Sequence, residues 1–374
     1  METQKSERLL SLDVFRGITI AGMILVNNPG SWGNIYPALE HAKWNGITPT
    51  DWIFPFFLFI VGVAITFSLT KRKERGDDHK RLMVQIFRRA AILFVLGLIM
   101  YGYPYFNLST QRIPGVLQRI AVCYFFSSFI FLKAGVKTIA YISAALLLAY
   151  WGIMTLIPVP GIGYPNLEPA TNLGAWLDRA ILGLDHLWKG SKVWDPEGIL
   201  STVPAVSTTL LGVLAGYWLR KKIEPAQKVV WLFVFGNAGL VLGTIWDIWF
   251  PINKGLWTSS YVVFTAGLAL QFLAICYWLI DVKGFKWWTK PFVVYGMNAI
   301  TVFFLSGIVA KTLGFIRFTN AQGKETSLMG YLYNSMFTWW LSPVNASLAW
   351  AILNVLFWLG IMWILYAKKI FIKV

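Results

Sequence analysis

The sequence predicts an all-α protein, a polytopic membrane bundle of about ten transmembrane helices with both termini in the cytoplasm. Its 374 residues are 57% hydrophobic and only 13% charged, whereas an average soluble domain has roughly 25% charged residues. The apolar residues fall in blocks, and a block of about 20 residues crosses a bilayer as a helix. The blocks lack the strict alternation of barrel strands, so helices must satisfy the backbone in lipid.

Ten apolar segments are the candidate spans. The first contains two charged residues and lacks a small-residue cleavage site, so we expect a span rather than a signal peptide. The stretch 329–342 is short and rich in Trp and Tyr, which favours an interfacial helix over an eleventh span. We expect residues 1–374 to form a single transmembrane domain. The ten spans are 11–28, 52–70, 90–104, 113–132, 138–157, 198–219, 229–250, 257–280, 291–312 and 345–367.

The distribution of charge predicts the orientation. One side, with both tails and every second connection, holds 22 Lys or Arg and 7 acidic residues, while the other side holds 9 of each. The positive-inside rule places the first side in the cytoplasm, and the loops 29–51 and 158–197 outside. Much of the positive charge lies in 71–89. This charge fixes the orientation of the chain in the membrane and meets anionic lipid headgroups. The alternative is that some of these residues also bind phosphate. Nucleic-acid binding is not expected, because no soluble domain displays this charge.

Polar residues inside the spans are few and therefore informative. Asp13 and Arg16 share a helix face, so they form an ion pair or leave Arg16 to contact an anionic ligand. Asn27 lies about three turns further, near the outer surface. Arg119 lies within the fourth span and needs an anion or several carbonyls, from a carboxylate or from a ligand. Asn298, in the ninth span, is expected to hydrogen-bond across helices or to a ligand.

The most distinctive stretch is HAKWNGITPTDW, just before the second span. Its His41 is one of three histidines, and imidazole can act as a general base or carry an acyl group. The alternative is a loop histidine that only hydrogen-bonds at the interface. Glu40 and Asp51 are candidates to orient the ring. We also expect Glu40, Trp44 and Asn45 to contact the substrate.

Asp195 and Glu197 flank a proline immediately before the sixth span. They interact favourably with the helix dipole, or they recognise a cationic or hydroxylated acceptor on the outer side. The sequence has no phosphate-binding P-loop, no dinucleotide fingerprint and no nucleophile elbow. No cluster has metal-ligand spacing, so we predict no metal.

Seven motifs follow one another along the chain: LDVFRG, VNNPG, HAKWNGITPTDWIFPFFLFIVG, RIPGVLQRIAVCYF, DPEGILST, KGLWTSSYV and YGMNAI. In this order they resemble one family, the bacterial relatives of heparan-α-glucosaminide N-acetyltransferase. The resemblance runs from about residue 8 to the C-terminus. It implies an enzyme of the bacterial cytoplasmic membrane that moves acetyl from cytosolic acetyl-CoA to the amine of a glucosamine beyond the membrane. It also implies that His41 is catalytic, that Asn27 lies near the active site, and that the protein is a homodimer.

This resemblance leads to a hypothesis for the route of the acetyl group. The nucleotide end of acetyl-CoA would bind near the cytoplasmic mouth, and its thioester would reach His41 from within the bundle. Two other functions remain open: a transporter of amino sugars or peptidoglycan fragments, and an O-acetyltransferase of an envelope glycan. The residues expected to contact the cofactor are Arg16, Arg89, Arg119 and Asn298.

Overall fold

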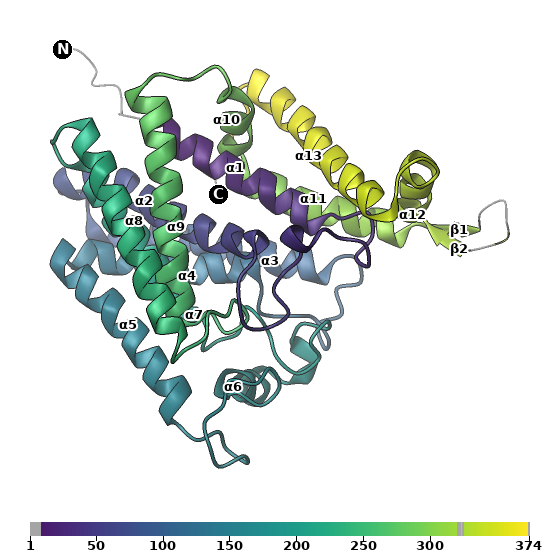
Figure 1. Ribbon diagram of the computed structural model, residues 1–374, viewed down its shortest axis with the longest axis horizontal. Coiled ribbons are helices and arrows are strands. Elements are labelled where there is room, and N and C mark those ends of the chain that lie inside the picture. The colour runs from purple at the N-terminus through teal and green to yellow at the C-terminus, as the bar shows by residue number, and fades with distance from the viewer. Residues whose placement is uncertain (1–8, 320–322, 324, 373–374) are drawn as a thin grey trace.

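The computed structural model describes residues 9–319, 323 and 325–372. Several of its long helices run from the upper left to the lower right in Figure 1, and others lie nearly horizontal. Among these residues, nine helices are long and apolar enough to cross a membrane, and one broken pair of helices would make a tenth span. The multi-pass helical fold is therefore confirmed.

The helices follow the predicted order, with short additional elements between them. The first group is α1 (Leu10–Asn27), α2 (Ile53–Glu74), α3 (His79–Gly102), α4 (Val116–Lys133), α5 (Val136–Leu156), α6 (Leu173–Leu182) and α7 (Thr202–Arg220). The second group is α8 (Pro225–Asp247), α9 (Ser259–Cys276), α10 (Lys290–Met297), α11 (Ala299–Phe315), α12 (Leu328–Tyr333) and α13 (Pro343–Ala367). The 3-10 turns are Pro37–Leu39, Pro49–Trp52 and Leu184–His186, and the π-helical turns are Tyr277–Val282 and Asn334–Thr338.

Glycines let the central helices pack backbone to backbone. A Cβ added at Gly62 of α2 would lie 1.9 Å from the carbonyl oxygen of Thr209 on α7. A Cβ at Gly212 of α7 would lie 2.0 Å from the carbonyl oxygen of Phe59. Small residues at helix contacts permit this approach in a membrane, where packing rather than the hydrophobic effect holds helices together. The α2–α7 pair therefore forms a closely packed centre around which the other helices gather.

The predicted span 291–312 is not one straight helix. It is broken at Asn298 into α10 and α11, whose axes differ by 79°. The backbone of Asn298 is not helical (φ −124°, ψ 38°). Its amide donates to the carbonyl of Ile370 and its side-chain oxygen accepts from the backbone N–H of Ile372. The C-terminal segment thus occupies the break, which is why apolar periodicity did not predict it.

Three further differences concern one helix end and two connections. The third helix begins at His79, earlier than the predicted 90, because Asp78 caps it by accepting from the N–H of Lys80. The outer loop 158–197 contains α6, which was not predicted. A small antiparallel hairpin of β1 (Arg317–Thr319) and β2 (Glu325–Ser327), which was not predicted, is added to this almost wholly helical fold. The stretch 329–342 forms only the short α12 and a π turn, and it is not a candidate span.

Four connections meet at one end of the bundle, which we call the outer end after its predicted orientation. The α1–α2 connection contacts the α8–α9 connection through the N–H of Gly46 and the carbonyl of Ile252. The α3–α4 connection contacts the long α5–α7 connection through Ile113 and His186.

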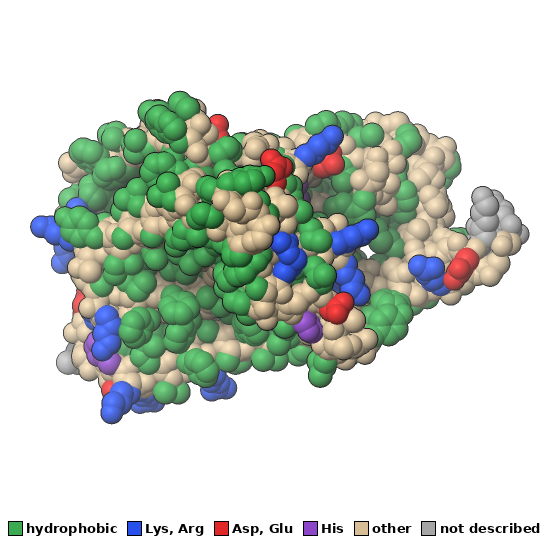
Figure 2. Space-filling view, turned by 90° about the horizontal axis from the view of Figure 1, so that it is seen from below, with side chains coloured by type: hydrophobic (Ala, Val, Ile, Leu, Met, Phe, Trp, Pro, Cys, Tyr) green, Lys and Arg blue, Asp and Glu red, His purple; other side chains and the backbone are tan. Residues whose placement is uncertain are grey.

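Figure 2 shows one group of Lys and Arg at the left edge and a second, mixed group of charges right of centre. Between the two groups this face is mostly hydrophobic, as expected of a lipid-facing surface.

Candidate active site

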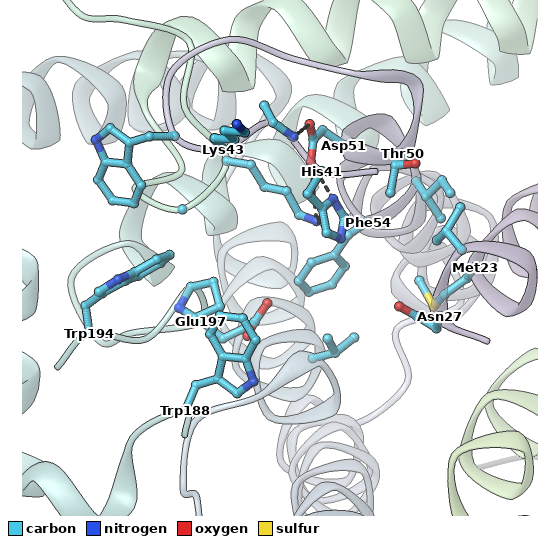
Figure 3. A pocket seen from close by; sticks show the side chains of 18 of the residues that line it. Met23, Asn27, His41, Lys43, Thr50, Asp51, Phe54, Trp188, Trp194 and Glu197 are labelled. Atoms are coloured by element: carbon cyan, nitrogen blue, oxygen red, sulfur yellow. Dashed lines mark hydrogen bonds and ion pairs between the residues drawn. The ribbon is translucent and has the colours of Figure 1, made fainter. Parts of the chain in front are cut away.

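A cavity of about 420 Å³ opens at the outer end of the bundle. The ends of α1, α2, α3 and α4 form one part of its wall, and the four outer connections form the rest. Figure 3 shows His41 and Asp51 together, with Asn27 on one side and Trp188, Trp194 and Glu197 on the other. The main polar and aromatic residues that line the cavity are Asn27, His41, Trp44, Asp51, Tyr101, Arg112, Trp188, Trp194, Glu197 and Lys254.

His41 is paired with Asp51 in this cavity. Its Nδ1 lies 2.6 Å from Oδ1 of Asp51, and 48% of the histidine side chain is exposed. A carboxylate can only accept a hydrogen bond, so it favours the tautomer with the proton on Nδ1. Nε2 is then the nitrogen with a lone pair. Of the two carboxylates expected to orient the ring, Asp51 makes this contact.

Asp51 lies at the start of the second long helix, and several hydrogen bonds hold it in place. It lies in the turn Pro49–Trp52, and its Oδ2 accepts from the backbone N–H groups of Thr48 (3.0 Å) and Ala42 (3.1 Å). Its backbone carbonyl accepts from the hydroxyl of Tyr261 at 2.6 Å. A Thr and an Asp three positions apart make the capping arrangement that local sequence favours. The sequence thus builds both the start of the helix and the partner of His41.

Lys254 is the third member of this polar group, and it was not among the residues predicted from the sequence. Its Nζ lies 3.0 Å from Nδ1 and 3.1 Å from Nε2 of His41, and 3.6 Å from Oδ1 of Asp51. Burial lowers its pKa, against the opposing effect of Asp51. The residue lies at the start of the KGLWTSSYV motif, which is the signal that could have identified it. It is held in place through Asn253, whose amide donates to Asn45 at 3.0 Å.

An arginine that was also not predicted from the sequence organises the opposite wall. Arg112 binds Asp195 through two hydrogen bonds of 2.8 and 2.6 Å, and it binds Glu197 at 2.5 Å. Burial alone would lower the pKa of Arg112, but Tyr101 and the two carboxylates raise it above its usual value. Asp195 is buried and also accepts from the N–H of Trp188. Asp195 therefore braces the wall, while Glu197 lines the cavity.

Three tryptophans shape the cavity around these charges. Trp44 meets Trp194 edge to face, with ring centroids 5.0 Å apart, and Trp188 meets Trp194 at 6.4 Å. The indole N–H of Trp44 donates to the carbonyl of Leu167 in the α5–α7 connection. Aromatic faces that supply contact area, with a few charged groups that fix orientation, are features of a small-molecule binding site.

The other residues predicted for this site divide into two groups. Asn27, at the end of α1, lines the cavity with His41. Glu40 is exposed and outside the lining, and its contribution to the loop is a backbone carbonyl that accepts from Thr48. Asn45 also lies outside the lining and binds Asn253. Direct contacts of Glu40 and Asn45 with a substrate stay predictions.

A second cavity, of about 490 Å³, lies nearer the inner end. It contains Arg16 and Arg89, which were both expected to contact the cofactor. Arg16 lies 3.4 Å from the carboxylate of Asp13 and 3.4 Å from the carbonyl of Gly296. Arg89 lies over the ring of Tyr124, 5.6 Å from its centroid.

The two cavities lie in line along the same helices. Phe54 lines the outer cavity and Phe57 lines the inner one, and they are three residues apart on α2. On α4, Val116 lines the outer cavity and Ile120, four residues further, lines the inner one. Three or four residues make about one helical turn, so only a short stretch of bundle separates the cavities.

Two predicted cofactor residues lie outside both cavities. Arg119 is buried in α4, where it donates to the carbonyl of Gly198 and to the hydroxyl of Ser201 and packs over Trp257. Asn298 binds the C-terminal segment instead of lining the inner cavity. A direct contact of either residue with a cofactor stays a prediction.

The family is decided by comparison with known proteins. The model of a family described as heparan-alpha-glucosaminide N-acetyltransferase, catalytic, matches residues 8–243, which is more than half of the chain. The chain belongs to this family. It is 31% identical to human heparan-alpha-glucosaminide N-acetyltransferase over 427 aligned positions, which cover 98% of this chain and 60% of the human protein. It is 30% identical to the mouse enzyme over 431 positions, which cover 100% of this chain and 62% of that protein.

The alignment covers nearly all of this chain, but the chain spans only about three fifths of the length of these relatives. The matched family region contains α1 to α7 and nearly all of α8. It includes His41, Asp51, Arg112 and Glu197, but not Lys254. Within the part of the chain that the structure describes, no three His, Cys, Asp or Glu side chains are grouped as metal ligands.

Proposed function

We propose that this protein is a transmembrane acetyltransferase, which moves acetyl from acetyl-CoA on the inner side to the amine of a glucosamine-type sugar on the outer side. The observation that carries the proposal is the His41–Asp51 pair in a cavity in line with a second, arginine-lined cavity. Membership of the N-acetyltransferase family supports the same reaction.

The inner cavity suits the donor. Acetyl-CoA carries several phosphate charges, and guanidinium groups bind phosphate well. Arg16 and Arg89 are the residues that would hold them, since both line the inner cavity. The thioester arm would then extend between α1, α2 and α4 towards Asn27. This route lets the acetyl group pass while the charged nucleotide stays on its own side.

The chemistry in the outer cavity follows from the tautomer of His41. Nε2 accepts a proton from the acceptor amine, and the amine nitrogen forms a bond to the acetyl carbonyl carbon. The carbon–sulfur bond breaks, and the thiolate takes up a proton. Asp51 stabilises the imidazolium that forms meanwhile. Asn27 would donate to the developing oxyanion, and a single such donor contributes about 2.7–4 kcal/mol.

A variant of this reaction has His41 carry the acetyl group covalently before the acceptor binds. Both routes use Nε2, and one experiment distinguishes them. Protein incubated with acetyl-labelled CoA and no acceptor becomes labelled in the covalent route only. In direct transfer, label appears only in the sugar, and only when both substrates are present.

The purified chain of 374 residues, reconstituted in lipid, tests the proposal. We expect it to retain acetyl-CoA and to produce N-acetylglucosamine from glucosamine. A protein that instead carries amino sugars across the bilayer without CoA would be a transporter, and the proposal would be wrong. Faster acetylation of hydroxyl groups than of the amine would reassign the acceptor to an envelope glycan. The bacterial cytoplasmic membrane and the homodimer stay predictions, to be tested by fractionation and by mass measurement in detergent.

A further inference from the structure

A lateral groove of about 510 Å³ opens between α4, α5 and α7. Helices α4 and α5 are joined by two residues at the inner end, and they diverge from there in Figure 1. Helix α7 packs against both and forms the floor. The lining extends along α4 from Gln118 to Ile130, a length of about 18 Å at the rise of an α-helix.

Most of the groove is apolar. Aliphatic and aromatic side chains of the three helices line it, and Phe126 at its side is 48% exposed. A groove of this shape and polarity matches one extended hydrocarbon chain. The apolar lining consists mainly of Val122, Phe126, Ile130, Ile142, Leu146 and Val206.

The outer end of the groove is polar, and part of that polarity is unsatisfied. Gln118 is 3% exposed and Arg119 is 2% exposed. Both amide atoms of Gln118, and Nε and Nη1 of Arg119, have no hydrogen-bond partner among the described residues. Buried polar groups are rarely left in this state. Two adjacent side chains with spare hydrogen-bonding groups, one of them cationic, indicate a ligand with an anionic oxygen.

Glu197 connects this groove to the outer cavity. It belongs to the lining of both, and its carboxylate is fixed by Arg112 at 2.5 Å. A molecule with its chain in the groove and its anionic group at Arg119 would therefore have its next polar group beside Glu197, at the wall of the cavity that contains His41.

We propose that the groove binds the hydrocarbon chain of a lipid-linked amino sugar, joined to its chain through a phosphate. The acceptor then reaches His41 from the membrane and not from water. This inference rests on the proposed function, and it specifies the class of acceptor. The chain lies between α4 and α5, the phosphate lies at Gln118 and Arg119, and the sugar passes Glu197 into the cavity.

The first test compares two acceptors: glucosamine, and glucosamine 1-phosphate esterified with a dodecyl chain. We expect a KM at least about tenfold lower for the dodecyl compound, because each buried methylene adds affinity. Ile142→Trp, which fills the groove from α5, should bring the ratio of the two kcat/KM values to about one. Leu148→Trp is the matched control, since Leu148 is on the same helix and 55% exposed but does not line the groove. Equal KM values for both acceptors in the wild type would overturn the proposal.

Binding without catalysis separates this proposal from the proposed function. Radiolabelled dodecyl phosphoglucosamine should be retained by the wild type and by Leu148→Trp, and retained at least about tenfold less by Ile142→Trp. Gln118→Leu should weaken this probe more than it weakens dodecyl glucosaminide, which has no phosphate. If binding follows this pattern but no acetyl is transferred, the proposed function fails and the groove assignment stands. If phosphatidylglycerol displaces the probe at equal concentration, the groove is a site for ordinary membrane lipid and the proposal is wrong.

Discussion

The imidazole of His41 and the carboxylate of Asp51 lie 2.6 Å apart, and the same carboxylate also binds the backbone of residues 42 and 48. One buried side chain therefore orients the ring and holds the loop that carries it. Asp51 is 1% exposed and is held in place, whereas the His41 side chain is accessible from the cavity. This is the arrangement that a general base needs.

Replacing His41 by Ala should abolish acetyl transfer to glucosamine. A positioned base contributes about 10²–10⁴-fold to the rate, and no other described imidazole lies in the outer cavity. Binding of acetyl-CoA, measured by calorimetry on the purified protein, should change less than about threefold, because the arginine-lined cavity is separate. Retention of more than a tenth of the wild-type rate would show that His41 is not the base.

Asp51→Asn should lower kcat by about 10²–10⁴-fold with a smaller change in KM, because an amide no longer enforces the tautomer or stabilises an imidazolium. Thr48→Val is the matched control, since its hydroxyl also contacts the Asp51 carboxylate but not His41. The control should retain most of the activity. Steady-state kinetics of both variants check this, and equal losses would point to a purely structural role for the carboxylate.

Gly46→Ala should destabilise the HAKWNG loop. Gly46 has φ +102°, a conformation that side chains strain, and its N–H binds the carbonyl of Ile252 beside Lys254. The expected cost is about 1–3 kcal/mol, seen as a lower melting temperature in detergent and weaker activity. Gly33→Ala, in the same connection but without a positive φ and with its nearest neighbour at 4.0 Å, should change neither. Equal effects of the two changes would contradict the strain argument.

Arg112→Lys should raise the KM for the acceptor and lower the melting temperature, because lysine cannot bind Asp195 through two bonds and reach Glu197 as well. Removing a partner from a buried ion pair costs about 3–5 kcal/mol, and retaining the charge should reduce that cost. Arg317→Lys is the surface control: its pair with Glu325 spans 3.9 Å and both side chains are 66% exposed. Unchanged acceptor KM in Arg112→Lys would separate Glu197 from substrate binding.

Asp178 should make stability depend on pH. Burial raises its pKa to about 6, and its Oδ1 accepts from the N–H of Ile199 next to the DPEG turn. The folded protein thus favours the protonated form, so stability should fall as pH rises from about 4 to about 6, by about 3 kcal/mol at most. Asp178→Asn keeps the acceptor oxygen and should remove this part of the pH dependence. Melting temperatures of both proteins between pH 4 and 8 measure it; parallel curves would refute the assignment.

Local sequence determined the class of protein and several local features, such as where helices start. Apolar blocks near 20 residues specify membrane helices because each such helix satisfies its own backbone hydrogen bonds. The Thr48–Asp51 spacing specifies a helix start, and it also brings Asp51 within reach of a histidine ten residues earlier. Such signals depend on neighbours along the chain, so they are visible without a fold.

Tertiary structure alone decided which distant groups meet. Lys254 reaches His41 across 213 positions, and Arg112 reaches Asp195 across 83. The break at Asn298 depends on the C-terminal segment, 72 residues away. Arg119, which was expected to contact the cofactor, lines the lateral groove and lies outside both cavities. Hydropathy records how apolar a helix is but not its rotation or its neighbours. Those are set by close packing at positions such as Gly62 and Gly212, where one backbone can approach another.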